Sequence, residues 1–95
     1  MKLPPNIHVI LHPLIQQKLT LARDRRTEND RFRRLLMQIA GLMVFELTRD
    51  YPTVEQEVDT PLGLCEGRVL ATEITVVPIL RAGLGMADGI LGMIP

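Results

Sequence analysis

The stretch ITVVPILRAGLGMADGILGM, from Ile74 to Met93, decides how the rest of the chain is interpreted. It is the most apolar part of the 95-residue sequence, yet Arg81 lies in the middle of it. Because a guanidinium group stays charged in a protein, burying it without an anionic partner is very costly. The opening run, ITVVPIL, is rich in β-branched residues with little polar alternation, which is typical of a strand covered on both faces.

The residues after this run predict a loop at 81–85 and a helix at 84–94. Glycines inside that helix weaken it by about 1 kcal/mol each relative to alanine, but they allow close packing. Strand, glycine loop and helix, about residues 73–94, make half of a βαβ unit. A second parallel strand would have to follow Pro95, so we expect the N-terminal portion of an α/β domain with an incomplete parallel sheet.

The loop has the features of an anion site. Backbone N–H groups at the start of a helix lack helical partners, and the helix dipole adds partial positive charge there. Gly83 lets the backbone approach an anion closely, and Arg81 offers planar, bidentate donors to phosphate. Asp88 breaks the dinucleotide pattern G-x-G-x-x-G, and the P-loop lysine is missing. From spacing alone, a plain strand-to-helix turn with Arg81 extending to solvent remains the alternative.

Two helices are predicted before this region. His12 and Pro13 mark the start of the first, about residues 13–23, since proline is favoured at the first helical position. The second, about residues 28–49, is amphipathic and ends before Pro52. Thr27 and Asp30 predict a capping box at its start. Its predicted apolar stripe consists of Phe32, Leu35, Leu36, Ile39, Met43 and Leu47.

A two-stranded β-arm is predicted at about residues 53–71. Val54, Gln56 and Val58 alternate with acidic residues, and residues 59–63 supply turn chemistry. A ribbon of two strands is rarely stable alone, so we expect it to pack on something, often a partner subunit.

The overall charge and composition of the chain argue against several classes of function. Eleven basic and eleven acidic residues balance, which removes any global electrostatic argument for binding nucleic acid or an anionic membrane. Pro78, Arg81 and Asp88 argue against a membrane span within the last segment. Cys65 is the single cysteine, so we expect a reduced cytoplasmic thiol and no metal site.

The segment ITVVPILRAGLGMADGIL resembles the corresponding part of the uracil phosphoribosyltransferases, which are type I phosphoribosyltransferases of pyrimidine salvage. The earlier block, HPLIQQKLTLARDRRTENDRFRRLLMQIAGLMVFELTRD, is similar to the N-terminal helices of the same family. The resemblance implies a Rossmann-like α/β fold and transfer of the phosphoribosyl group from PRPP to N1 of uracil, giving UMP and diphosphate. It implies a PRPP-binding loop at Arg81, Ala82 and Gly83.

The resemblance also implies Mg²⁺ on the PRPP diphosphate and a homo-oligomer, a dimer or higher. Some members are activated by GTP, to which a basic helix face could contribute, although such a face usually means a solvated surface. The arginines on this face are Arg31, Arg33 and Arg34.

The family's Thr-Gly-Gly PRPP signature and its uracil-recognition segment are absent from the sequence. We therefore expect the catalytic residues to lie beyond Pro95 and the chain to be inactive alone. The alternative is a non-catalytic, truncated module for interaction or dimerisation.

Overall fold

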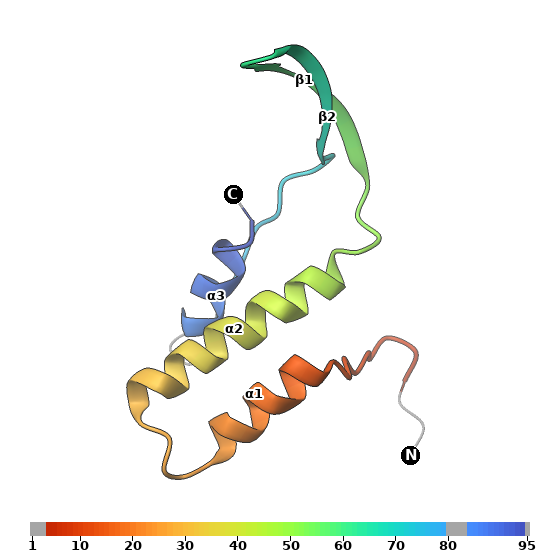
Figure 1. The fold of residues 1–95 in the computed structure, drawn as a ribbon. Helices are drawn as coiled ribbons and strands as arrows, with labels where there is room; N and C mark the ends of the chain where they lie inside the picture. Colours follow the sequence, from red (N-terminus) through yellow and green to blue (C-terminus); the bar gives the residue numbers. More distant parts are fainter. Residues whose placement is uncertain (1–3, 80–83, 95) are drawn as a thin grey trace.

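The computed structural model describes residues 4–79 and 84–94, and these form three helices and one β-hairpin (Figure 1). Helix α1 spans Pro13–Arg23, as predicted. Its N-cap is His12, whose Nδ1 accepts a hydrogen bond from the backbone N–H of Leu14 at 3.1 Å. Because proline at the first position has no N–H to satisfy, this sequence begins a helix at little cost.

Helix α2 spans Asn29–Leu47, close to the predicted range, but the predicted capping box is wrong. Glu28 is the N-cap and makes no side-chain cap hydrogen bond. The Thr27 hydroxyl instead donates to the carbonyl oxygen of Leu21, at 2.6 Å. The Leu21 carbonyl oxygen at the end of α1 thus accepts two hydrogen bonds, from the Thr27 hydroxyl and from the Asp24 backbone N–H.

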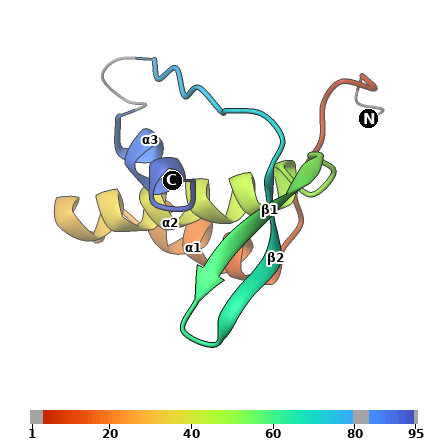
Figure 2. The ribbon, with the colours of Figure 1, turned by 90° about the horizontal axis from the view of Figure 1, so that it is seen from above.

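The core lies along α2, which packs against α1 on one side and α3 (Leu84–Leu91) on another (Figure 2). Only part of the predicted stripe is buried, because two neighbouring helices use two faces of α2. Phe32 and Leu47 are 40% and 65% exposed, whereas Ala40 and Val44, outside the predicted stripe, are buried. The buried apolar residues are Ile15, Leu35, Ile39, Ala40, Val44 and Ala87.

The hairpin confirms the predicted β-arm. Strand β1 spans Thr53–Thr60 and pairs in antiparallel register with β2, Gly63–Leu70. The connecting turn places Gly63 at φ +120°, where only glycine is unstrained. The Thr60 hydroxyl donates to the Gly63 carbonyl oxygen at 2.6 Å and closes the turn.

The strand predicted after the hairpin is not formed in the described residues. Residues 73–79 are in no helix or strand, and they alternate in exposure. Ile74, Val76 and Pro78 are half-buried, whereas Val77 and Ile79 are each 83% exposed. The run of β-branched residues predicts a segment buried on both faces. In the structure only one face of residues 73–79 is partly buried. A strand needs hydrogen-bonded neighbours, and no parallel partner lies among the described residues.

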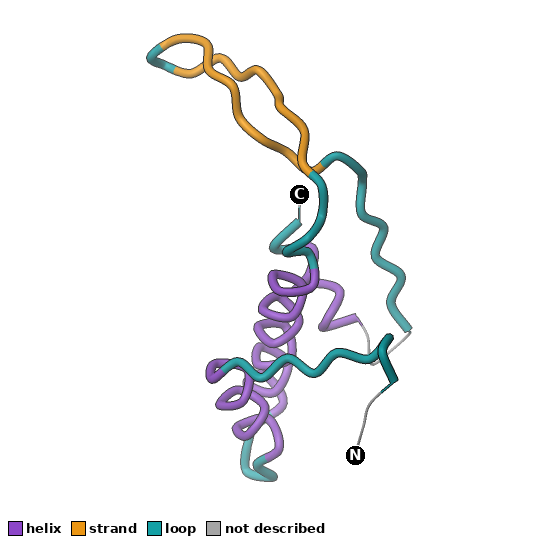
Figure 3. Tube along the Cα trace, turned by 90° about the vertical axis from the view of Figure 1, so that its right-hand side faces the viewer, coloured by secondary structure: helices purple, strands orange, loops and turns teal. Residues whose placement is uncertain are grey.

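The described chain is an incomplete α/β fold whose hairpin projects away from the helices (Figure 3). Its accessible surface is 8421 Å². A folded monomer of this length is expected to expose about 5,500 Å². The radius of gyration is 17.0 Å, against about 12 Å for a compact chain of this size. Surfaces that a compact domain would cover are therefore open to solvent.

Candidate functional site

The predicted anion loop connects the extended segment to α3. Arg81, Ala82 and Gly83, the three residues assigned to it, lie outside the described residues. The structure describes both flanks, ending at Ile79 on one side and resuming at Leu84 on the other. The helix predicted at 84–94 corresponds to α3. It begins at Leu84, as predicted, and it ends at Leu91, before the predicted end. Its first turn, among the residues described, carries no acidic side chain.

Close packing fixes α3 on α2. A Cβ added to Gly89 would come within 2.8 Å of the Met37 Cα, so the backbone of α3 lies directly on the backbone of α2. A Cβ on Gly41 would meet the Met93 Cγ at 3.4 Å. Ala87 is only 7% exposed. Because the helices meet through backbone and small residues, the start of α3 has little freedom to shift relative to α2.

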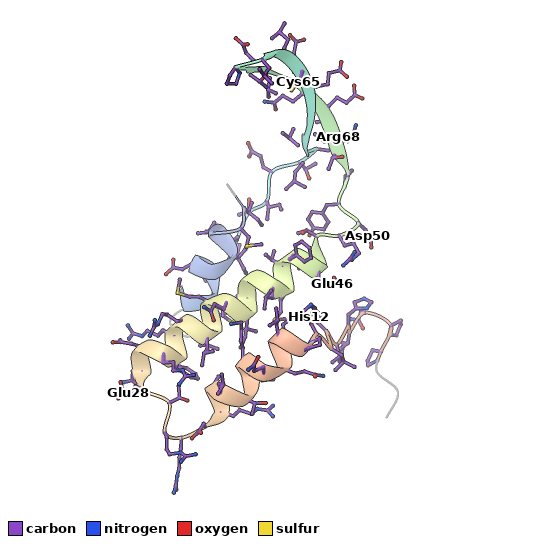
Figure 4. All side chains as sticks on the ribbon, viewed as in Figure 1. His12, Glu28, Glu46, Asp50, Cys65 and Arg68 are labelled. Carbon is purple, nitrogen blue, oxygen red and sulfur yellow. The ribbon has the colours of Figure 1, made fainter. Side chains whose placement is uncertain are left out.

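A groove of about 710 Å³ lies between the segment before α1 and the C-terminal end of α2. Glu46 and Arg49 form a bidentate ion pair beside it, with N–O distances of 3.0 and 2.6 Å. The hydrogen bonds from Arg49 lower the pKa of Glu46, and the nearby His12 contributes to the same shift. Figure 4 shows Glu46 and His12 facing this region from α2 and from the start of α1.

His12 has the helix-start role that the sequence predicted, because its Nδ1 is used as the cap. The groove itself was missed by the sequence analysis. The only signal for it was the apolar run before His12, whose members Val9 and Leu11 are 61% and 74% exposed.

A second cavity, about 430 Å³, lies at the connection between α1 and α2. Arg31 and Arg34 line it, but Arg33 does not. Hydrogen bonds from Arg26 lower the pKa of Asp24, with a smaller contribution from the charge of Arg31. The charged residues of the lining are three arginines and three carboxylates: Asp24, Arg26, Glu28, Asp30, Arg31 and Arg34. These charges balance, so the cavity is not a strongly basic anion pocket.

Within residues 4–79 and 84–94, no group of three or more His, Cys, Asp or Glu side chains could hold a metal ion. In the same part of the chain, no helix has the length and hydropathy needed to cross a membrane.

The close contact of Met37 and Gly89 was also missed. Glycines in a predicted helix indicate close packing in general, but no pattern says which helix or which residue lies opposite.

Comparison with known proteins gives one consistent result. A family model described as "Uracil phosphoribosyltransferase" matches residues 9–95. The uracil phosphoribosyltransferase of Dictyoglomus turgidum is 53% identical over 88 residues, which are 92% of this chain and 42% of that protein. The enzyme of the same name from Bacillus caldolyticus is 50% identical over 90 residues, covering 94% of this chain and 43% of that protein.

A solved structure, that of the AQ2163 protein from Aquifex aeolicus, superposes with a TM-score of 0.85 at 37% identity. The match covers 90% of this chain and 42% of that one. The chain therefore spans about two fifths of the length of the proteins that it resembles.

Proposed function

The chain belongs to the uracil phosphoribosyltransferase family, and on that premise we propose that it supplies the diphosphate-binding loop of an enzyme that converts uracil and PRPP to UMP and diphosphate. In this reaction N1 of uracil bonds to C1 of the ribose while the bond from C1 to the diphosphate oxygen breaks. The proton on N1 is released. The family match over residues 9–95 carries the proposal.

The role assigned to the loop follows from the charge that develops on the leaving group. As the diphosphate departs it gains negative charge, and fixed donors facing it stabilise the transition state more than the ground state. Arg81 would hold two of its oxygens with its planar donors. Ala82 and Gly83 would present backbone N–H groups at close range. The close packing of α3 on α2 supports this role, because it fixes the position of the helix that follows the loop.

Mg²⁺ belongs to the proposal as part of the substrate, held by the diphosphate of PRPP. The described residues of this chain do not fit a resident metal site, since no three suitable side chains gather there. A GTP activator is the least supported part, because the balanced charges of the cavity at the α1–α2 connection oppose strong binding of an anion. We further propose a cytoplasmic location and a homo-oligomer, dimeric or higher.

A second candidate is a non-catalytic interaction module. It is favoured by the accessible surface of 8421 Å², which a stable independent domain would not leave open. The DNA downstream of the Pro95 codon separates the two. A reading frame that continues into a Thr-Gly-Gly loop supports the enzyme, whereas a natural stop codon supports the module.

Turnover by the 95-residue chain is the first test. We expect no UMP when the purified chain is incubated with radiolabelled uracil, PRPP and Mg²⁺, because the chain matches only about two fifths of its relatives. Formation of UMP by this chain alone would overturn that expectation.

The loop itself is tested in a complete enzyme. Residues 9–95 would replace their counterparts in the Bacillus caldolyticus relative, and Arg81→Ala would be introduced into the chimera. We expect the KM for PRPP to rise by about tenfold or more, since a charge-assisted contact to the diphosphate is lost. Arg81→Lys should recover only part of it, because lysine cannot form the bidentate contact. Arg25→Ala, at an exposed arginine between α1 and α2, is the control. An unchanged KM in Arg81→Ala would refute the assigned role.

A further inference from the structure

The contact between α2 and α3 is made by main-chain atoms on both sides. A Cβ added to Gly89 would meet the carbonyl oxygen, the carbonyl carbon and the Cα of Met37, the last two at 2.8 Å. Only glycine leaves room for so close an approach of two backbones. Figure 2 shows α3 lying against α2, and the contact at Gly89 sets how near the two helices come.

The chain is held on α2 a second time, just beyond the end of α3. A Cβ added to Gly41, on α2, would meet the Met93 Cγ at 3.4 Å. Ala87, which lies between Gly89 and the start of α3, is only 7% exposed. The helix is therefore fixed on α2 at its middle and at its far end.

The near end of α3 adjoins the predicted diphosphate loop. Leu84, the first residue of α3, directly follows Gly83, the last residue assigned to that loop. Gly89 lies further along the same helix, about 7.5 Å from Leu84 along the helix axis. Because the hydrogen bonds of a short helix keep it in one piece, a shift at Gly89 is passed on to Leu84.

We propose that Gly89 is a positioning residue for the binding of PRPP. By letting the two main chains touch, it sets where α3 begins and hence where Arg81 and Gly83 present their donors to the diphosphate. The inference rests on the role of the loop in the proposed function and adds a residue to it. Gly89 does not contact the substrate and acts through the loop.

The size of the displacement makes this role significant. Ordinary contacts of a Cβ begin at 3.4 Å, against 2.8 Å here, so Gly89→Ala requires α3 to retreat from the Met37 Cα by about 0.6 Å. Clearing the Met37 carbonyl oxygen requires more. With Met93 held on Gly41, α3 tilts about its far end, and its start moves about twice as far as position 89. A misplacement of about 1 Å at a reacting centre can cost about 100-fold in rate.

A residue that served stability alone would have a different signature. Loss of packing lowers the fraction of folded enzyme, but each folded molecule keeps its affinity for PRPP. A displaced loop weakens PRPP binding in every folded molecule. Isothermal titration calorimetry separates the two roles, because the stoichiometry reports the folded fraction and the dissociation constant reports the site.

The test uses the chimera that carries residues 9–95 in the Bacillus caldolyticus relative. Titration of Mg²⁺ and PRPP into Gly89→Ala should give a dissociation constant about tenfold higher or more, while the KM for uracil stays unchanged. Gly92→Ala is the matched control. Its added Cβ has only ordinary contacts, with the carbonyl oxygens of Asp88 and Gly89 at 3.5 Å, so it should bind PRPP as the parent chimera does.

Gly41→Val presses on the same contact from α2 and serves if Gly89→Ala does not fold. It adds two methyl groups beyond a Cβ that would already touch Met93. Because the Met93 side chain can move part of the way, we expect a smaller rise in the dissociation constant, about threefold. An unchanged dissociation constant in whichever of the two variants folds, with or without a reduced stoichiometry, would refute the positioning role.

Combining Gly89→Ala with Arg81→Ala shows whether Gly89 acts through the loop. Residues that act through one another are not additive, so Gly89→Ala should weaken PRPP binding by a smaller factor in the Arg81→Ala background. Equal factors in both backgrounds would also refute the proposal. An unchanged KM for PRPP in Arg81→Ala would be a different failure, because it would refute the proposed role of the loop and this inference with it.

Discussion

The contact of α2 with α3 and the hairpin are two regions of one small chain with opposite kinds of stability. At the helix contact, Gly89 lies against the backbone of Met37 and the nearby Ala87 is buried. In the hairpin, the strands are held by their own hydrogen bonds, and side chains on both faces are exposed. The helix contact is thus complete within the chain, whereas no described helix covers either face of the hairpin. Substitutions at the helix contact should change the stability of the helices, and substitutions in the hairpin should change the stability of the hairpin alone.

The largest effect should come from removing the close approach of the two helices. Gly89→Ala places a Cβ inside the space of the Met37 main chain, which cannot swing away as a side chain can. We expect a loss of about 3 kcal/mol in the free energy of unfolding, at the upper end for overpacking, measured by urea denaturation followed by circular dichroism at 222 nm.

Gly85→Ala is the matched control, because it lies in the same helix with nothing within 4 Å of its added Cβ. There alanine should stabilise α3 by about 0.5–1 kcal/mol. Equal effects of the two substitutions would mean that α3 does not pack on α2 through Gly89.

A smaller effect, confined to the hairpin, is expected from Gly63→Ala. At φ +120° an added Cβ is strained by about 1–2 kcal/mol. Because no described helix contacts the hairpin, amide hydrogen exchange should speed up in β1 and β2 and stay unchanged in α2.

Gly67→Ala, also in the hairpin, is the matched control, because there is room for its added Cβ. It should leave amide hydrogen exchange unchanged in the hairpin and in α2. If the α2 amides also lost protection in Gly63→Ala, the two regions would be coupled, and the contrast between them would be wrong.

The same contrast explains what could be predicted from the sequence. The start of α1 at Pro13 and the hairpin ends were predictable, since proline, turn residues and period-two alternation act over a few neighbouring residues. The core was predicted only in part, because burial of Ala40 depends on how neighbouring helices cover α2. Thr27 was wrongly predicted to cap α2, because a local pattern does not show a hydrogen-bond partner in another helix. Its partner, Leu21, lies in the preceding helix.

The candidate site also combines features that depend on neighbouring residues with features that depend on contacts between distant segments. Local chemistry predicts an anion site at the glycine loop with Arg81 and Gly83, and this stays a prediction because both residues lie outside the described ones. The groove near His12 could not, because it forms where two segments far apart in sequence come together. Residues 73–79 were predicted as a strand covered on both faces, with its parallel partner expected beyond Pro95, and they form no strand among the described residues.

The smallest effect concerns pH, and it is expected in the helical region. The pKa values of Glu46 and Asp24 are lowered in the folded chain, chiefly by hydrogen bonds from Arg49 and Arg26 respectively. A carboxyl group with a depressed folded pKa binds protons more readily when unfolded. It therefore stabilises the fold above its unfolded pKa, and that stabilisation is lost as the pH falls through the folded pKa.

Both carboxyl groups are exposed to solvent, so the decline in helix stability below about pH 4 should be small. Glu46→Gln should reduce the acid-side slope of the α2 unfolding midpoint, because it removes the carboxyl group whose pKa is lowered. The comparison is made by denaturation at pH 3 and pH 6 in low salt, because salt screens exposed ion pairs. Equal slopes in the wild type and in Glu46→Gln would show that the ion pair with Arg49 contributes nothing measurable. The stability of the helices would then come from the packing around Gly89 and the buried core alone.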